Sequence, residues 1–345
     1  MSWRDLRLNP FPAPVISSQE WRTYTTISLL NWVLSAAFIF AALVTVANSS
    51  LSFSPQTNIP SIVILLIIIT VLLIATSFCK DKFWAVMLNT VCLIAAVHFS
   101  STVISYTSQY WAAKVPLRDA LIAKADSRLG FNWAAWRYWL NERFVLENAL
   151  RAIYSYSLPV QLGLLTCVQS FASLEVRMQR LCFAAQLSLL ITLVIAALFP
   201  TLGPYHYFGL HSTANAPNLF PAATGAHVDD IFNLRSTSPI IPFERMQGII
   251  TFPSFHAELG ILFVWSVWPV PFMRLIATTI NGLMIAAVPL CGAHYLTDVI
   301  AGAVVAGAAI FIETVFLSFL VFSRAPEIGA SAKLATSGPA SDPPV

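Results

Sequence analysis

Two histidines in the C-terminal part of the chain have the neighbours that a catalytic imidazole needs. His256 ends the segment Phe-Pro-Ser-Phe-His, and His294 stands in the segment Gly-Ala-His-Tyr-Leu-Thr-Asp, which ends at Asp298. If a helix begins at His294, its imidazole and the Asp298 carboxylate lie on one helix face, where the carboxylate can hold the ring. This is the arrangement of a nucleophile with an orienting partner.

The chain between the two histidines predicts that they meet. From His256 an apolar stretch runs to about residue 272, turns at Pro-Val-Pro and Arg274, and returns as a second stretch to about residue 290. Each stretch is close to the ~17 to 25 residues of a membrane-spanning helix. We therefore expect both imidazoles at one face of the bilayer, where ionisable groups are usually functional. For either histidine alone, a contact at a helix end is the competing explanation.

The composition predicts an all-α, polytopic membrane protein. Of the 345 residues, 57% are hydrophobic and 10% are charged, whereas soluble domains have about 25% charged residues. Apolar stretches that suit membrane spans cover residues of about 27–47, 59–78, 83–106, 153–174, 181–199, 255–272, 275–290 and 295–322. We therefore predict a bundle of about eight transmembrane helices.

The basic residues predict the orientation of this bundle. With a cytoplasmic amino terminus, Arg and Lys gather in the inner segments, and the short outer loops near residues 48–58 and 291–293 carry none. This distribution follows the positive-inside rule. It predicts a cell (inner) membrane protein with both termini cytoplasmic and with His256 and His294 on the extracytoplasmic face. The basic stretch 107–148 is an exception, but long segments cross largely regardless of their charge.

Four parts follow from this pattern. Residues 1–106 form an N-terminal cytoplasmic segment and three spans, and residues 107–150 form an aromatic-rich amphipathic segment, which lies in the membrane interface or caps the bundle. Residues 151–323 form the core that carries both histidines. This core contains a proline-rich outer loop, residues 200–253, in which long helices are excluded. The tail 324–345, rich in Ala, Ser, Gly and Pro, is predicted to be disordered.

No metal, cofactor or nucleic acid is predicted. Histidines and aspartates of the proline-rich loop match no closed zinc ligand set; these are His206, His211, His227, Asp229 and Asp230. The formal net charge of +3 is small and spread over both faces, so it does not indicate a nucleic-acid partner. The five cysteines lack CxxC spacing and lie in or beside the apolar stretches, where we expect packing roles.

Residues 248–256 and 292–302 resemble two signature motifs of the type 2 phosphatidic acid phosphatase superfamily. The first contains Pro-Ser-x-His and the second Gly-x-His-x-x-x-Asp, and their details are most similar to the inositolphosphorylceramide synthase (inositolphosphotransferase) branch. The resemblance implies a phosphatidic acid phosphatase-type catalytic core and metal-independent phosphoryl transfer through a phosphohistidine. In that reaction His294 would attack phosphorus, Asp298 would orient it, and His256 would protonate the departing oxygen.

The resemblance leaves the phosphate-binding groups open. Ser254 could donate to a phosphate oxygen at a helix start, or simply cap that helix. The superfamily's Lys and Arg-Pro motif is not recognisable, and Ala287 and Val288 occupy the places of its Ser-Arg. We expect Arg235 or Arg245 of the loop to bind phosphate, Arg235 above all, because the synthase-like branch has a Leu-Arg about this far before Pro-Ser-x-His. The alternative is a solvated loop charge, and other candidates are Arg137, Arg143 and Arg151.

The expected function is phosphoryl transfer on a phosphorylated phospholipid, sphingolipid or isoprenoid within the membrane. Hydrolysis by a lipid phosphatase and transfer of a head group to an acceptor remain open alternatives, and the oligomeric state is not predicted. A lipid transporter or a non-catalytic lipid-binding protein is the competing class. Against a transporter, the histidines cluster at one face, whereas transport sites lie near the middle of the membrane.

Overall fold

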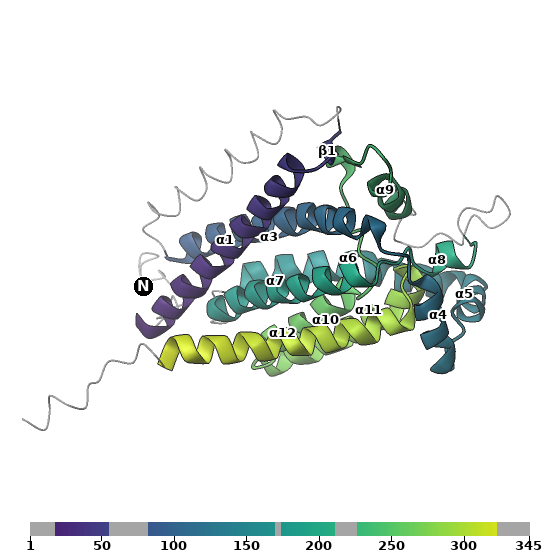
Figure 1. The fold of residues 1–345 in the computed structure, drawn as a ribbon. Helices are drawn as coiled ribbons and strands as arrows, with labels where there is room; N and C mark the ends of the chain where they lie inside the picture. The colour runs from purple at the N-terminus through teal and green to yellow at the C-terminus, as the bar shows by residue number, and fades with distance from the viewer. Residues whose placement is uncertain (1–17, 55–81, 170–173, 211–225, 323–345) are drawn as a thin grey trace, which may run out of the picture.

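Most of the described chain forms long helices that run side by side (Figure 1). The computed structural model describes residues 18–54, 82–169, 174–210 and 226–322. The predicted span 59–78, the tail 324–345 and part of the proline-rich loop lie outside the described residues.

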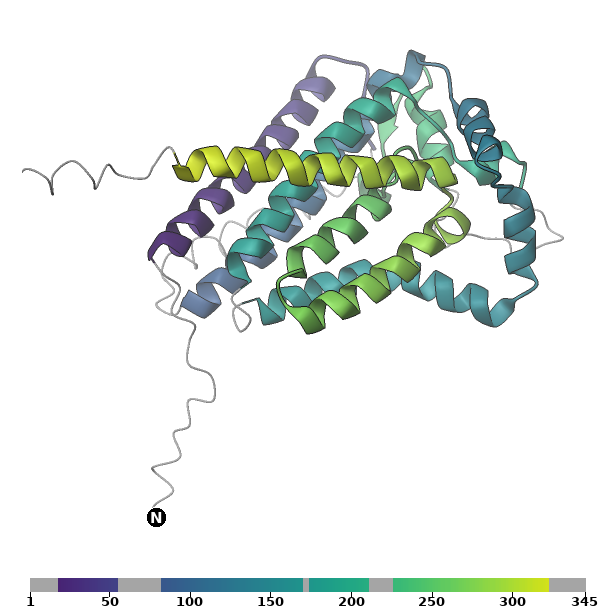
Figure 2. The ribbon, with the colours of Figure 1, turned by 90° about the horizontal axis from the view of Figure 1, so that it is seen from below.

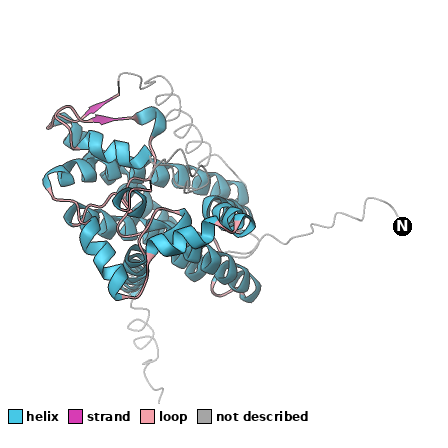
Figure 3. Cartoon of the chain, turned by 90° about the vertical axis from the view of Figure 1, so that its right-hand side faces the viewer, coloured by secondary structure: helices cyan, strands magenta, loops and turns pink. Residues whose placement is uncertain are grey.

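The long helices are α1 (Ser18–Ala47), α3 (Lys82–Trp111), α6 (Phe144–Val168), α7 (Glu175–Leu198), α10 (Phe255–Val267), α11 (Pro271–Cys291) and α12 (Leu296–Phe322). The short elements are β1 (Ser52–Phe53), η1 (Ala112–Lys114), α4 (Asp119–Arg128), α5 (Trp133–Asn141), α8 (Pro204–Tyr207), α9 (Ala226–Leu234), β2 (Ile240–Ile241) and η3 (Phe243–Arg245). The predicted all-α class is confirmed, since the only strands in the described ranges are the parallel pair β1 and β2 (Figure 3).

The chain is a multi-pass membrane protein by the length and composition of its helices. Five of the described helices are long and apolar enough to cross a bilayer, namely α1, α3 with η1, α7, α11 and α12. Helix α10 is apolar but shorter. Large apolar side chains cover the outside of the bundle, as in Phe40, Phe311 and Phe319, which are 69%, 68% and 72% exposed. Such a surface suits contact with lipid rather than water.

Helix α7 is the central helix of the bundle. Of its most apolar stretch 61% is buried, against 28% to 44% in the other four spanning helices. It packs against α1, α3, α10 and α12. Ser188 and Thr192 of α7 both donate hydrogen bonds to the buried carboxyl group of Glu258 on α10. This contact fixes α10, which carries His256 in its first turn, against the centre of the bundle.

One end of the bundle carries a cap of short elements. The proline-rich segment contributes α8, α9 and β2, and the segment 112–141 contributes η1, α4 and α5. Helix α4 packs against α12 and α8, and α5 packs against α11 and α6. The start of α1 and the end of α12 lie at the opposite end (Figures 1 and 2). The two histidine motifs lie at the capped end, because α10 and α12 both begin there.

Candidate active site

His294 lies in a tight connection between α11 and α12. Helix α11 ends at Cys291 and α12 begins at Leu296, so His294 precedes the helix rather than sharing its face with Asp298. Ala293 has a φ of 60°, a left-handed conformation that costs a residue with a side chain about 1 to 2 kcal/mol. This turn of the backbone brings the His294 ring over the start of α12.

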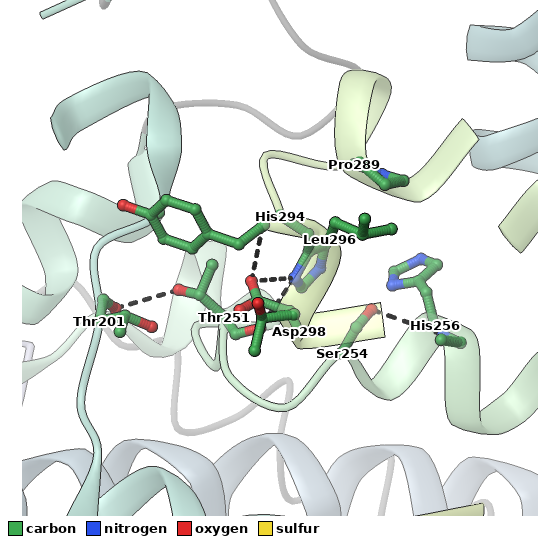
Figure 4. Close-up of polar contacts among 12 residues, drawn as sticks. Thr201, Thr251, Ser254, His256, Pro289, His294, Leu296 and Asp298 are labelled. Atoms are coloured by element: carbon green, nitrogen blue, oxygen red, sulfur yellow. Dashed lines mark hydrogen bonds and ion pairs between the residues drawn. The ribbon is translucent and has the colours of Figure 1, made fainter. Parts of the chain in front are cut away.

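Two acceptors hold one nitrogen of the His294 ring. Nδ1 lies 2.8 Å from the carbonyl oxygen of Thr251 and 3.3 Å from Oδ2 of Asp298. Because a carbonyl oxygen can only accept, Nδ1 carries the proton in this arrangement, and the lone pair of the neutral ring is on Nε2. The bond to Thr251 is the shorter of the two, so a backbone group outside the motif of His294 orients the ring as much as the carboxylate does (Figure 4).

Asp298 is fixed by the turn that it helps to form. Its side chain is fully buried, and Oδ2 accepts a hydrogen bond of 2.9 Å from the backbone amide of Tyr295. Asp298 is the third residue of α12, and a carboxylate at that position commonly binds the amide that precedes the helix. The contact with His294 therefore arises from helix capping, and not from the shared helix face that the spacing predicted.

The environment of His294 keeps its ring neutral. Burial lowers the pKa of His294 to about 4, although the hydrogen bond to Thr251 opposes the shift. The side chain of His227 adds a smaller effect in the same direction as burial. A neutral imidazole with a free lone pair is a competent nucleophile, and at neutral pH this ring needs no base to deprotonate it.

The segment with His256 is joined to the segment with His294 through the backbone. The amide of Ser254 donates a 3.0 Å hydrogen bond to the carbonyl oxygen of Asp298. A Cβ atom on Gly302 would lie only 2.5 Å from the carbonyl oxygen of Ser254, so the absence of a side chain at Gly302 permits this approach. Figure 4 shows the His256 and His294 rings facing each other, with Ser254 between them.

Ser254 caps helix α10. It has the extended backbone conformation of an N-cap residue, and its hydroxyl accepts from the amide of Ala257 at 3.5 Å. Its side chain is fully buried. Ser254 is therefore the N-cap of α10, as one of the two interpretations of its role predicted. With Ser254 in this place, the amides at the start of α10 lie beside the space between the two histidines.

Tyr154 on α6 is a site residue that sequence reasoning missed. Its ring stacks on the His256 ring with centroids 4.5 Å apart, and its hydroxyl lies 3.4 Å from Nδ1 of His256. The same ring lies against Gly292, where an added Cβ atom would come within 2.6 Å of it. Tyr154 thus contacts both motifs from a helix far away in sequence. No local pattern around Tyr154 signals this role.

The two loop arginines have partners elsewhere. Arg235 donates to the carbonyl oxygens of η1 and its flank, at 3.1 Å to Ala113 and 3.0 Å to Val115. Arg245 pairs with Asp230 at 2.9 Å, and its side chain is 51% exposed. Both guanidiniums hold the loop in place. Their partners among the described residues are not members of the His294 cluster, by which we mean His294, Thr251, Tyr295 and Asp298. That Arg235 or Arg245 binds phosphate stays a prediction, and in this structure their donors hold the loop.

A second pair of arginines lies closer to the motif segments. Glu147 accepts from Arg137 at 2.5 Å and from Arg151 at 2.7 Å, so one carboxylate bridges two guanidiniums and leaves a net charge of about +1. Arg137 lies 5.9 Å from the centre of the Tyr205 ring. Burial raises the pKa of Tyr205, and the positive charges of Arg137 and Arg151 oppose that rise.

The arginine pair is tied to the segment that leads to His294. The hydroxyl of Tyr205 donates to the carbonyl oxygen of Leu290 at 3.0 Å. Trp133 of α5 donates to the carbonyl oxygens of Pro289 and His294, at 2.8 and 3.1 Å. Arg151 lies one turn before Tyr154 on α6, and Tyr154 stacks on His256. Arg137 and Arg151 are therefore linked, through Tyr205 and through their helices α5 and α6, to the segments that carry His294 and His256.

The fold and the site define a helical membrane protein. At one end of its bundle lies a site with two histidines, His256 and His294, and one carboxylate, Asp298. A family model described as the PAP2 superfamily matches residues 120–312, which is more than half of the chain. The chain therefore belongs to the PAP2 superfamily. Members of this superfamily are generally phosphatase-type enzymes, and the site fits that class of activity. No curated protein and no solved structure matched the chain. The assignment to the inositolphosphotransferase-like branch stays a prediction.

Proposed function

We propose that this protein transfers a phosphoryl group from a phosphorylated lipid through a covalent phosphohistidine at His294. The observation that carries the proposal is the hydrogen bonding of His294, whose Nδ1 is held by Thr251 and Asp298 while Nε2 keeps its lone pair. A ring fixed in this way is ready for in-line attack without reorganisation. PAP2 superfamily membership supports the same chemistry.

The first half of the reaction forms the phosphohistidine. Nε2 of His294 attacks phosphorus, a P–N bond forms, and the P–O bond to the lipid alcohol breaks. His256 in its imidazolium form gives a proton to the departing oxygen, and Asp298 stabilises the charge that develops on the His294 ring. Burial and the nearby His294 lower the pKa of His256, so the negative charge of the bound phosphate is needed to protonate it. In the second half His256 takes a proton from water or an acceptor alcohol, whose oxygen attacks phosphorus and releases His294.

Arg151, with Arg137, is proposed to bind the phosphate. Both belong to a cluster of net charge about +1, and Arg151 is partly accessible, with 31% of its side chain exposed. A guanidinium presents several donors in a plane and binds phosphate oxygens in pairs. The amides at the start of α10, beside Ser254, would supply further donors at a helix N-terminus. No step of this scheme uses a metal ion.

The substrate is proposed to enter from the membrane, with the site on the extracytoplasmic face and both termini cytoplasmic. The ends of the described chain lie together at the end opposite the site, which supports that orientation (Figure 1). The basic residues of the inner segments support it as well. Labelling of single-cysteine variants near Trp139 at the capped end and near Trp268 in the turn between α10 and α11, in cells and in lysed cells, tests which end faces outward.

The choice between phosphatase and phosphotransferase is decided by product analysis. Purified protein is given phosphatidic acid, undecaprenyl diphosphate, or phosphatidylinositol with ceramide, and free phosphate is measured against transferred head group. Release of phosphate from either of the first two substrates identifies a phosphatase. Formation of inositolphosphorylceramide identifies the transferase. Turnover of none of them by wild-type protein, or full turnover by His294→Ala, would refute the proposed function in favour of a transporter or lipid-binding protein.

A further inference from the structure

Helix α4 reaches the turn between the two catalytic residues from a distant part of the chain. Asp126 on α4 accepts hydrogen bonds from the amide of Leu296 at 2.9 Å and from the amide of Thr297 at 2.8 Å. It also accepts from the hydroxyl of Thr297 at 2.6 Å. Asp126 is only 2% exposed. All three donors belong to the segment that joins His294 to Asp298.

This contact supplies a helix cap that the local sequence lacks. The first amides of an α-helix have no partner within the helix, and a Ser, Thr, Asp or Asn just before it usually binds them. Before α12 that place is taken by Tyr295, whose hydroxyl is bonded elsewhere. Asp126 binds the amides of the first two helical residues, while Asp298 binds the amide of Tyr295. The two carboxylates together therefore satisfy three successive amides.

A second carboxylate of α4 holds the other side of the same turn. Asp119 accepts from the hydroxyl of Tyr295 at 3.0 Å and from the amides of Leu202 and Gly203 at 3.1 and 2.9 Å. A Cβ atom on Gly203 would lie 2.7 Å from the carbonyl oxygen of Ala293, so the backbone of residue 203 lies directly against the residue before His294. Asp119 and Asp126 are seven residues apart, which places both on one face of α4.

We propose that Asp126 is a positioning residue for the reaction: by holding the first turn of α12 it sets the orientation of Asp298 and, through it, of His294. The inference rests on the proposed function, and it assigns α4 to the active site rather than to a passive cap. Catalytic groups need placement within about 0.5 Å, and a displacement of about 1 Å can cost ~10²-fold in rate. Loss of the cap should therefore lower kcat more than it raises KM.

The test compares variants of Asp126 in purified full-length protein with phosphatidic acid as substrate, or with whichever tested lipid the wild type turns over. Asp126→Asn keeps the size but replaces one acceptor with a donor, and kcat is expected to fall about 10- to 100-fold with KM changed less than about 3-fold. Asp126→Glu retains the carboxylate and should recover part of this loss. Thr297→Val removes only the hydroxyl bond and should cost less than about 5-fold.

Glu142→Gln is the matched control. Glu142 follows α5, its side chain is 76% exposed, and its ion-pair partner among the described residues is Arg143 at 3.6 Å. The substitution removes one carboxylate from the same cap, so kcat and KM should stay at wild-type values. Thermal unfolding in detergent checks that each variant is folded. If Asp126→Asn does not fold, Asp126→Glu and Thr297→Val take its place, and wild-type kcat in both would overturn the inference.

Amide hydrogen exchange tests the contact without relying on activity. Exchange at residues 295–298 should accelerate at least about 10-fold in Asp126→Asn and stay unchanged in Glu142→Gln, because the first amides of α12 lose their acceptor. Unchanged exchange in Asp126→Asn, or a loss that appears only in KM, overturns the inference. If His294→Ala is inactive while Asp126→Asn has wild-type kcat, the positioning role fails alone. If His294→Ala is as active as wild type, the proposed function fails instead.

Discussion

The two ends of the bundle both bury charged or ionisable side chains, but they use them differently. At the end away from the site, Arg180 of α7 binds Glu313 of α12 through two hydrogen bonds of 2.6 and 2.7 Å. Nearby, Arg177 donates to the carbonyl oxygens of Trp265 and Ser266 at the end of α10. There, each guanidinium donates hydrogen bonds to carboxylate or carbonyl oxygens. These bonds hold α7 against α10 and α12.

At the capped end the polar groups orient two imidazole rings. Thr251 and Asp298 hold Nδ1 of His294, Asp126 holds the turn, and Tyr154 holds His256. The bonds to the two imidazoles reach Nδ1 of each ring, and the charge pairs of this end, Glu147 with Arg137 and Arg151 and Asp230 with Arg245, do not include either histidine. The two ends therefore differ in that the far-end pairs satisfy each guanidinium with acceptors, whereas the bonds to the His294 ring are made to Nδ1 and not to Nε2.

The largest difference between the two ends is expected from His294→Ala. Removing the nucleophile abolishes the covalent route, so turnover of the accepted lipid phosphate should fall by several orders of magnitude. Thermal stability should also fall, because a buried ring and its two hydrogen bonds are lost, so turnover is compared per folded molecule. Turnover is followed by phosphate release or head-group transfer, with unfolding in detergent as the control. Turnover by His294→Ala near the wild-type rate would show that His294 is not the nucleophile. The two ends of the bundle would then not differ in function.

A smaller effect is expected from loss of the ring that supports His256. Tyr154→Leu removes the stacked ring and should lower kcat about 10- to 100-fold, because His256 gains freedom to leave its orientation. Tyr154→Phe keeps the ring and loses only the hydroxyl contact of 3.4 Å, so kcat should fall less than about 5-fold. The ratio of the two kcat values is the measurement. Equal losses in both would assign the role to the hydroxyl and not to stacking.

The pH dependence of the reaction tests whether His294 is neutral at the capped end. Burial lowers the pKa of His294 to about 4 from an ordinary value of 6.5. His294 therefore stays neutral and nucleophilic as the pH falls through 6.5, and it is protonated only near the lowered value. In a profile of kcat/KM for the free enzyme, no loss from the nucleophile is expected between about pH 5 and 7. A limb near pH 6.5 that shifts in an Asp298 variant would belong to His294 and would contradict its lowered pKa.

The smallest effect on catalysis is expected at the far end. Glu313→Gln removes the acceptor charge for Arg180, whose side chain is 25% exposed, and should lower the free energy of unfolding by about 1 to 3 kcal/mol. The kcat per folded molecule should remain within about 2-fold of wild type, since no residue of the His294 cluster contacts this pair. A large loss of kcat with unchanged stability would show that the far-end pair is coupled to the chemistry.

The helical class predicted from the sequence is confirmed, for a clear physical reason. Apolar stretches of membrane length predict helices, and two consecutive spans return the chain to the end at which it started. The structure accordingly has α10 and α11 between His256 and His294. The number of spans was harder to predict. Helix α6 contains Glu147, Arg151 and Pro159, and it is not among the five described helices that meet the length and composition of a span.

The groups around the histidines could not be read from spacing. The loop arginines Arg235 and Arg245 precede His256 in sequence, yet their guanidiniums bind η1 and Asp230. Arg151 and Tyr154 come from α6, and Asp126 comes from α4, so their positions depend on how distant helices pack. The acceptor for His294 at Thr251 is a backbone carbonyl, which every residue type has. Such contacts leave no local pattern in the sequence.

Trapping the covalent intermediate shows whether the phosphoryl group passes through His294. Wild-type protein and His294→Ala are mixed with phosphatidic acid carrying a labelled phosphate, or with the labelled form of another accepted lipid, and quenched in alkali within milliseconds to seconds. The covalent mechanism predicts an acid-labile, alkali-stable label on the peptide that contains His294 in wild type, and none in His294→Ala. A label that persists in His294→Ala, or turnover by wild type with no label on His294, would contradict it.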